Sequence, residues 1–159
     1  MLSDDGGQTW EESCTVLPAF ARSAVFSPGY PDDPSVWVGS YGSGVRVSHD
    51  GGVRWEVLEG LDEHLYVEGM VAAPGYPDDP VLMVVTSRRL MRSADGSESF
   101  EHVLLPGIEL LHEVVLSPSF DEDRFALAVG TTDDEGQWSV ARSADAGATW
   151  EQAWTSEPP

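Results

Sequence analysis

The sequence contains no lysine and no asparagine, and all eight of its basic residues are arginine. Twenty-eight acidic residues oppose them, so the formal net charge at pH 7 is −20. Nucleic acids and anionic membrane surfaces need a positively charged partner, so this shortage of basic residues argues against both as ligands. One explanation of such a charge is a surface that keeps the protein soluble, as in a protein from a salt-adapted or GC-rich source. The other is attraction of a cationic ligand.

Cysteine and long apolar runs are also scarce. Cys14 is the single cysteine, which excludes an internal disulfide and a zinc site built on cysteines. No run of about eighteen apolar residues is present, so no membrane-spanning helix is predicted, and residues 1–4 do not resemble a signal peptide. The localisation is therefore unknown from these residues, and a secreted or cell-surface parent stays open.

The usual signatures of catalysis and cofactor binding are missing too. The patterns G-x-S-x-G, G-x-x-x-x-G-K and H-E-x-x-H do not occur. The four histidines hold unrelated positions and do not form a convincing set of metal ligands. The sequence thus predicts neither a metal site nor a cofactor.

What the sequence does contain is an octet that occurs four times. Its copies begin at Ser3, Ser48, Ser93 and Ser143, at intervals of 45, 45 and 50 residues. The pattern S-x-D-x-G-x-T-W is complete in the first and last copies. The second copy has Arg54 in place of Thr, and the third has Ser97, Ser99 and Phe100 in place of Gly, Thr and Trp. A fixed period of this length predicts an array of similar structural units.

The chemistry of the octet is that of a hairpin turn. Ser and Asp side chains accept hydrogen bonds from nearby backbone N–H groups, Gly adopts the positive φ of a tight turn, and the aromatic residue anchors the next strand. A calcium loop would need several carboxylates, and each copy has only one or two. The positions with this predicted structural role are Ser3, Asp5, Gly7, Trp10, Ser48, Asp50, Gly52, Trp55, Ser93, Asp95, Phe100, Ser143, Asp145, Gly147 and Trp150.

A second motif recurs in step with the octet. The sequence PGYPDDP at residues 28–34 returns at residues 74–80, and more loosely at residues 118–123. Together the two motifs resemble the Asp-box (bacterial neuraminidase, BNR) repeats of β-propellers, which occur in sialidases, sortilin-type receptor ectodomains, photosystem II assembly factors and xyloglucan-active endoglucanases. Because this superfamily includes hydrolases, receptors and assembly factors, the resemblance implies a fold but not one activity.

The runs between the motifs are short, rich in β-branched and aromatic residues, and separated by Gly, Pro and Asp, with no helix signal. We therefore predict an all-β fold: a partial β-propeller of about three four-stranded antiparallel blades plus one extra strand. Residues 9–17 are predicted to form the outer strand of an incomplete blade. The predicted units are residues 1–17 for that incomplete blade, 18–58, 59–105 and 106–154 for the full blades, and 155–159 for a tail.

The predicted number of blades has a consequence for assembly. Propellers close with about four to eight blades, and three blades leave an open sheet edge at each end. We expect either a fragment of a longer propeller, which the octet close to Met1 favours, or a homo-oligomer that completes the ring.

Each blade should place its first strand along the propeller axis. The residues six positions before Pro28, Pro74 and Pro118 should then lie together at the mouth of that axis. These residues differ in chemistry although the positions repeat, which is the pattern of a binding site in a propeller. Solvated strand ends are the favoured alternative, because propeller axes are often polar and filled with water. The predicted binding residues at this mouth and its surrounding loops are Arg22, Glu68, His112, His64, Tyr66 and Trp138.

The sequence favours a non-catalytic segment that serves as a binding or scaffold surface for a protein or glycan ligand. The alternative is part of a carbohydrate-active hydrolase of the sialidase or xyloglucanase kind, with Glu68 and Glu113 as candidate carboxylates. A sialidase would hold its substrate with an arginine cluster, whereas Arg46, Arg92 and Arg142 are expected at equivalent third-strand positions as structural support. A purely structural module with no ligand is a third possibility.

Overall fold

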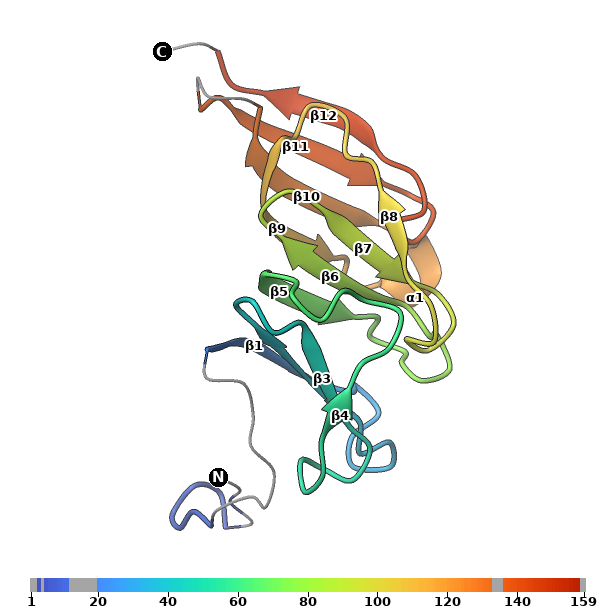
Figure 1. The fold of residues 1–159 in the computed structure, drawn as a ribbon. Coiled ribbons are helices and arrows are strands. Elements are labelled where there is room, and N and C mark those ends of the chain that lie inside the picture. The colour runs from blue at the N-terminus through green and yellow to red at the C-terminus, as the bar shows by residue number, and fades with distance from the viewer. Residues whose placement is uncertain (1–2, 4, 12–19, 133–135, 158–159) are drawn as a thin grey trace.

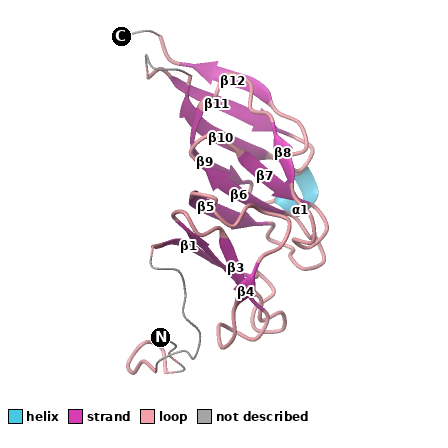
Figure 2. Cartoon of the chain, in the orientation of Figure 1, coloured by secondary structure: helices cyan, strands magenta, loops and turns pink. Residues whose placement is uncertain are grey.

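The computed structural model describes residues 3, 5–11, 20–132 and 136–157, and they fold into three antiparallel four-stranded sheets (Figures 1 and 2). The first sheet contains β1 (Ala21–Phe26), β2 (Val36–Ser40), β3 (Val45–Ser48) and β4 (Glu56–Val57). The second contains β5 (Val67–Ala72), β6 (Leu82–Thr86), β7 (Leu90–Ser93) and β8 (Glu101–Val103). The third contains β9 (Leu110–Leu116), β10 (Ala126–Thr131), β11 (Trp138–Ser143) and β12 (Glu151–Thr155). The all-β fold predicted from the sequence is confirmed.

Part of the prediction falls outside the described residues. The extra strand predicted at residues 9–17 lies largely in residues 12–19, which are not described and which include Cys14. The segment between residues 131 and 138, where the longer interval between the last two octets adds polar residues, includes residues 133–135, which are not described either.

One helical turn, α1 (Phe120–Asp123), corrects the prediction that no helix would form (Figure 2). It lies in the third copy of the PGYPDDP motif. In the first two copies the last residue is Pro34 or Pro80, and proline has no N–H to donate. Arg124 holds that position in the third copy, and its N–H donates to the carbonyl of Phe120 at 2.9 Å. The added hydrogen bond completes the turn of helix.

The core consists of two layers, one between each pair of neighbouring sheets. Between the first and second sheets, Trp37 of β2 packs with Leu82 and Val84 of β6. Between the second and third, the large Met83 meets the small residues of β10 and β11. The middle strands β2 and β6 are buried on both faces, so their sequences are almost continuously apolar rather than alternating.

The four octets form closely similar turns. In each, the Ser hydroxyl donates to an Asp oxygen at 2.7–2.9 Å and accepts from the backbone N–H four residues after the Ser at 2.7–2.9 Å. The same Asp oxygen accepts from the backbone N–H four residues after the Asp at 2.8–3.0 Å. The Trp indole N–H of three copies donates to the Gly carbonyl at 2.9–3.1 Å. The repeated side chains thus satisfy the backbone groups of the turns.

The two ends of the sheets are built from different segments. At one end, which we call the octet face, each of the last three octets bonds to the neighbouring PGYPDDP-type turn, as between Gly51 N and Pro34 O at 3.0 Å. At the other end, which we call the loop face, lie Phe20 before β1, the segments that precede β5 and β9, and the turns after β2 and β6. Leu111 N donates there to Ser87 O at 2.8 Å, which joins the second and third sheets.

One expected equivalence is wrong. Arg92 lies opposite Glu101 and Arg142 opposite Glu151, and each precedes its octet Ser by one residue. Arg46 precedes Ser48 by two residues and lies opposite Val57. Because alternate residues of a strand point to opposite faces, Arg46 projects from the other face of its sheet.

Candidate functional site

A cleft of about 450 Å³ opens on the loop face between the first strands of the three sheets. Arg22 comes from β1, Glu68 from β5 and His112 from β9. The repeat gives these residues the same position in three stacked sheets, and the stacking brings them to one place. The residues that line the cleft are Arg22, Glu68, Ser87, Leu110, Leu111 and His112.

Each of the three first-strand residues lies at an irregularity in the strand pairing. In β1 the register shifts between Ala21 and Ser23, so Arg22 has no partner in the ladder. In the same way Glu68 falls at the shift in β5, and His112 at the shift in β9. Bulges of this kind turn a side chain away from its regular direction and are frequent beside functional sites.

Glu68 is held by donors from both neighbouring elements. Arg22 Nη2 lies 3.3 Å from Glu68 Oε2, and the Ser87 hydroxyl donates to Glu68 Oε1 at 3.1 Å. The Arg22 side chain is 60% exposed, whereas that of Glu68 is 22% exposed. Because an exposed ion pair contributes only about 0–1 kcal/mol, the pair matters more for the charge it displays than for stability.

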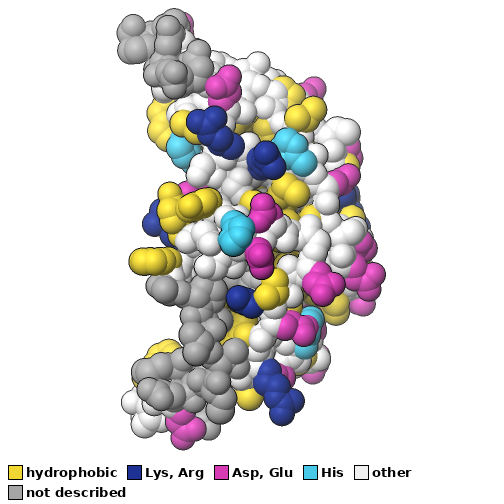
Figure 3. Space-filling view, in the orientation of Figure 1, with side chains coloured by type: hydrophobic (Ala, Val, Ile, Leu, Met, Phe, Trp, Pro, Cys, Tyr) yellow, Lys and Arg dark blue, Asp and Glu magenta, His cyan; other side chains and the backbone are white. Residues whose placement is uncertain are grey.

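Exposed aromatic rings surround the cleft on the same face. Tyr41 and Tyr66 meet edge to face with ring centroids 4.6 Å apart, and the His112 ring lies 5.4 Å from that of Trp138. About half of each of these three large rings is exposed. In Figure 3, hydrophobic side chains project at the left edge, on the loop face, whereas acidic side chains gather at the right. The loop face therefore combines polar groups with exposed aromatic surface.

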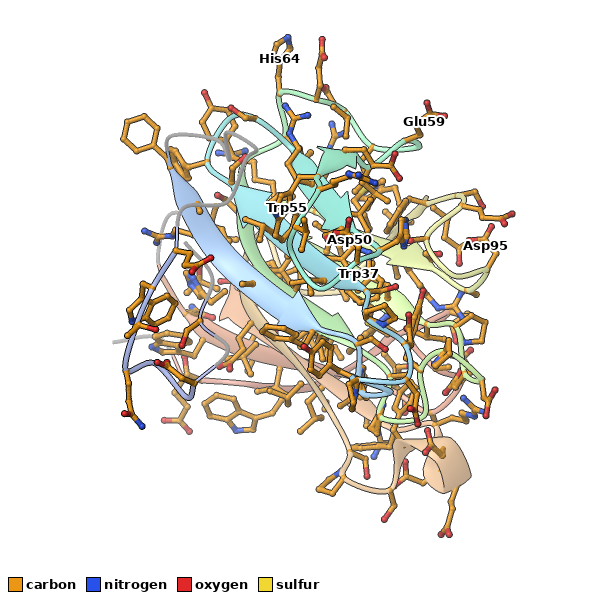
Figure 4. The ribbon with its side chains drawn as sticks, turned by 90° about the horizontal axis from the view of Figure 1, so that it is seen from below. Trp37, Asp50, Trp55, Glu59, His64 and Asp95 are labelled. Atoms are coloured by element: carbon orange, nitrogen blue, oxygen red, sulfur yellow. The ribbon has the colours of Figure 1, made fainter. Side chains whose placement is uncertain are left out.

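The predicted binding residues divide into two groups. Arg22, Glu68 and His112 share the cleft, whereas His64, Tyr66 and Trp138 do not line it. Trp138 adjoins the cleft through His112, and Tyr66 packs on Tyr41. His64 lies at the tip of its loop and points away from the sheets, with its Nε2 3.7 Å from Glu63 Oε1 (Figure 4). Glu113, the second candidate carboxylate, is exposed in β9 beside His112 and is not among the lining residues.

Sequence reasoning missed Ser87, Leu110 and Leu111 of the cleft and the aromatic partner Tyr41. Ser87 and Tyr41 belong to turns after second strands, and their repeat position alone predicts that they lie on the loop face. The two leucines carried no such signal, because apolar residues within a strand are equally expected in the core.

The Asp carboxylates of the octets differ from the cleft residues in their electrostatic environment, because hydrogen bonds within their own turns surround them. Hydrogen bonds from the Thr9 side chain and backbone lower the pKa of Asp5 to about 2, and those from Ser99 lower the pKa of Asp95 to about 2. The backbone N–H of Arg54 likewise lowers the pKa of Asp50. These carboxylates remain ionised and are satisfied within their own turns, as a structural role requires.

The described part of the chain offers neither a cluster of metal-binding side chains nor a membrane-spanning helix. Its His, Cys, Asp and Glu side chains form no group of three or more that could hold a metal ion. Over the same residues, no helix has the length and apolar character needed to cross a membrane.

Comparisons with known proteins identify the repeat and the fold. A family model described as the BNR/Asp-box repeat matches residues 1–12. No curated protein matches the chain in sequence. Among solved structures, YCF48 from Cyanidioschyzon merolae has a TM-score of 0.57 at 20% identity, over 84% of this chain and 36% of YCF48. A structure of YCF48 bound to D1 peptide has a TM-score of 0.59 at 20% identity, over 93% of this chain and 45% of the other.

The GH74 xyloglucanase from Xanthomonas campestris has a TM-score of 0.63 at 16% identity, over 82% of this chain and 21% of the enzyme. The chain thus spans less than half the length of the structures that it resembles here. At these identities the similarity establishes the fold, and the predicted partial β-propeller is confirmed.

Proposed function

We propose that this chain, a β-propeller segment of the Asp-box (BNR repeat) superfamily, binds an extended segment of another protein through its loop-face cleft, without catalysis. The observation that carries the proposal is the set of three bulges at Arg22, Glu68 and His112. Three sheets interrupt a regular ladder at the same position, and three different side chains occupy the interruptions. Neither packing in a core nor exposure of a strand end to solvent requires this arrangement. In a binding site, however, a bulge directs a side chain toward the ligand.

The composition of the face supports a peptide as the ligand. Exposed Tyr and Trp rings supply contact area at a small entropic cost, and the cleft supplies polar groups of both charges. The net charge of −20 steers a positively charged segment toward the protein. A structure of similar fold, that of YCF48, has a D1 peptide bound, which supports a peptide as the ligand proposed here. We therefore propose a segment with basic and aromatic residues.

A carbohydrate-active hydrolase is the second candidate, favoured by the similarity of fold to a xyloglucanase. Such an enzyme needs two carboxyl groups placed across the scissile bond. Both oxygens of Glu68 already contact donors from Arg22 and Ser87, and Glu113 does not line the cleft. This arrangement supports binding over hydrolysis.

The test is calorimetric titration with two synthetic peptides of equal length, one bearing Arg and Tyr, the other with Glu in place of each Arg. We expect the basic peptide to bind more tightly. The combined variant Arg22→Ser, Glu68→Ser and His112→Ser should weaken binding of the basic peptide about tenfold or more, which corresponds to about 1.4 kcal/mol. A matched control replaces Arg54, Glu98 and His102, three exposed residues of the same types away from the cleft, by Ser. The control should bind like the wild type.

Two outcomes would contradict the proposal. Equal affinity of the wild type and the cleft variant would remove the cleft from binding. Hydrolysis of xyloglucan or of a sialoside that is lost in Glu68→Gln or Glu113→Gln would establish the enzyme instead.

A further inference from the structure

The three sheets stack in one direction, so each end of the stack has an outer sheet face that no strand of the described residues covers. We call the outer face of the first sheet the leading face; near it lie Phe26, Tyr30 and Trp55. We call the outer face of the third sheet the trailing face. Its apolar residues pair across the strands, Val115 with Leu127 and Val129 with Val140, and Val140 also with Trp154. Val115 and Trp154 are exposed, and the other three are half-buried.

The two junctions inside the chain show how such faces pack. At the first, Tyr76 of the second PGYPDDP turn lies edge to face on Trp37, with ring centroids 5.1 Å apart, and is only 7% exposed. At the second, Phe120 holds the same repeat position and is buried in one core with Met83. The aromatic residue of the octet joins the same cores, as Phe100 in the first junction and Trp150 in the second. The second and third sheets therefore each insert two aromatic anchors into the sheet before them.

The leading face carries the same two anchors, and no neighbouring sheet of the described residues receives them. Tyr30 holds the position of Tyr76 and Phe120 but is 50% exposed. Trp55 holds the position of Phe100 and Trp150, is half-buried, and lies on the outer side of the first sheet, which faces the viewer in Figure 4. The anchors are present at this end of the stack, and the described part of the chain supplies no receiving sheet for them.

The trailing face carries the receiving surface. Leu127 lies opposite Arg142 as Met83 lies opposite Arg92, so these two apolar residues are equivalent. Met83 is fully buried beneath the third sheet, whereas Leu127 is half-buried. The trailing face therefore repeats a surface that already receives a sheet within this chain.

The two arginines show the difference between a covered and an uncovered face. Arg92 Nε donates across the second junction to the octet carbonyl of Ala146 at 2.8 Å, while its Nη1 donates to Glu101 at 2.8 Å. Arg142 has no octet in front of it among the described residues, and its Nε donates to Glu151 at 2.7 Å instead. The side chain of Arg92 is 11% exposed and that of Arg142 is 54% exposed.

We propose that the trailing face binds the leading face of a second copy of this chain, head to tail. Tyr30 and Trp55 of the second copy pack over Leu127. Arg142 Nε turns to the octet carbonyl of Gly51 of the second copy, the repeat equivalent of Ala146, and keeps Glu151 on its other nitrogens. A second copy is the occupant because this chain itself carries both halves of the junction, and it joins them twice internally.

The geometry of closure favours two copies. The two faces differ, so the contact is heterologous, and such contacts form a ring where the rotation closes. Two copies bring six sheets together, within the range of about four to eight blades in closed propellers. Leu127 and Arg142 of this contact do not line the loop-face cleft, so variants at these residues test the contact separately from the proposed peptide binding.

The test is the solution mass of the full chain by analytical ultracentrifugation at about 100 µM, a concentration at which a contact of micromolar Kd is occupied. We expect twice the chain mass of 17.2 kDa. Leu127→Asp and Arg142→Glu on the trailing face, and Tyr30→Asp on the leading face, should each shift the mass to a single chain. Leu104→Asp, which charges a leucine that is 76% exposed in the segment between β8 and β9, is the matched control and should keep the double mass.

Mixing separates a head-to-tail contact from a symmetric one. The Leu127→Asp variant keeps an intact leading face, and the Tyr30→Asp variant keeps an intact trailing face. Their mixture should therefore regain the mass of two chains through one junction, although neither variant does so alone. A wild type that remains a single chain, a mass above two chains, or a mixture that stays monomeric overturns the proposal; circular dichroism of each variant verifies that it is folded.

Discussion

The octet face and the loop face lie at the two ends of the same strands, and different features repeat at each end. On the octet face the side chains repeat along with the backbone: Ser, Asp and Gly return in the octets with nearly the same hydrogen bonds. On the loop face only the backbone position repeats, and Arg22, Glu68 and His112 replace one another at equivalent bulges.

The difference separates the residues that hold the sheets together from the residues that the sheets expose on their surface. The octet aromatics Phe100 and Trp150 enter the layers between sheets, and most polar groups of the octets are satisfied within the turns. The loop-face aromatics are exposed, and their polar neighbours come from different sheets. We therefore expect octet-face substitutions to reduce stability and loop-face substitutions to change binding.

The sharpest contrast is between two tryptophans of the third sheet. Trp150 is 8% exposed, lies in the core and donates its indole N–H to Gly147 O, whereas Trp138 is 52% exposed. Trp150→Ala should lower the free energy of unfolding by about 3–5 kcal/mol, because it opens a cavity between two sheets. Trp138→Ala should change it by less than about 1 kcal/mol. Urea denaturation measures both, and equal losses would break the distinction between the faces.

Two glycines of the third sheet give the next largest contrast. Gly147 in the octet and Gly136 before β11 both have positive φ, of 79° and 68°. A Cβ at Gly147 would collide with the Met83 side chain, whereas one at Gly136 would meet nothing within 4 Å. Gly136→Ala should cost about 1–2 kcal/mol from backbone strain, and Gly147→Ala should cost about 1–3 kcal/mol more through overpacking. Because both variants place alanine at a positive φ, the difference between their denaturation midpoints measures the overpacking against Met83 alone.

The octet carboxylates predict how stability depends on pH. Asp5 and Asp95 have a pKa of about 2 in the folded chain, below the ordinary value of 3.8. Their stabilisation is therefore complete above the ordinary pKa and is lost as the pH falls from there toward 2. Ser99→Ala removes the main cause of the Asp95 shift, so its acid transition should begin at higher pH. Thermal unfolding at several pH values measures this, and superimposable wild-type and variant curves would contradict it.

The smallest effect on stability is expected at the cleft. Arg22→Ala breaks an ion pair whose arginine is 60% exposed, so it should change the free energy of unfolding by less than about 1 kcal/mol. The same variant should bind the basic and aromatic peptide measurably more tightly, because it removes a competing cation from the Glu68 carboxylate, which keeps the Ser87 hydroxyl as a donor. A large loss of stability without a change in peptide affinity would reassign the pair to a structural role.

Several features of the fold were predictable because they depend on local chemistry. The octet pattern indicated turns at residues 3–10, 48–55, 93–100 and 143–150, and the spacing indicated which first-strand residues are equivalent. The bulges were not predictable, because a register shift depends on the partner strand as much as on the bulged residue. The prediction that Arg46 is equivalent to Arg92 and Arg142 failed for a similar reason. A shift of one position along a strand reverses the face on which a side chain lies.

The sequence by itself determined the unit of this protein and its repetition, because turns and alternating strands follow from residues that are near one another in the chain. Only the tertiary structure decided which of the equivalent residues are covered. Tyr76 and Tyr30 have the same local sequence, yet one is buried on Trp37 and the other is half exposed. Burial depends on whether a neighbouring sheet lies in front of the residue, and that sheet comes from a distant part of the chain or from another copy.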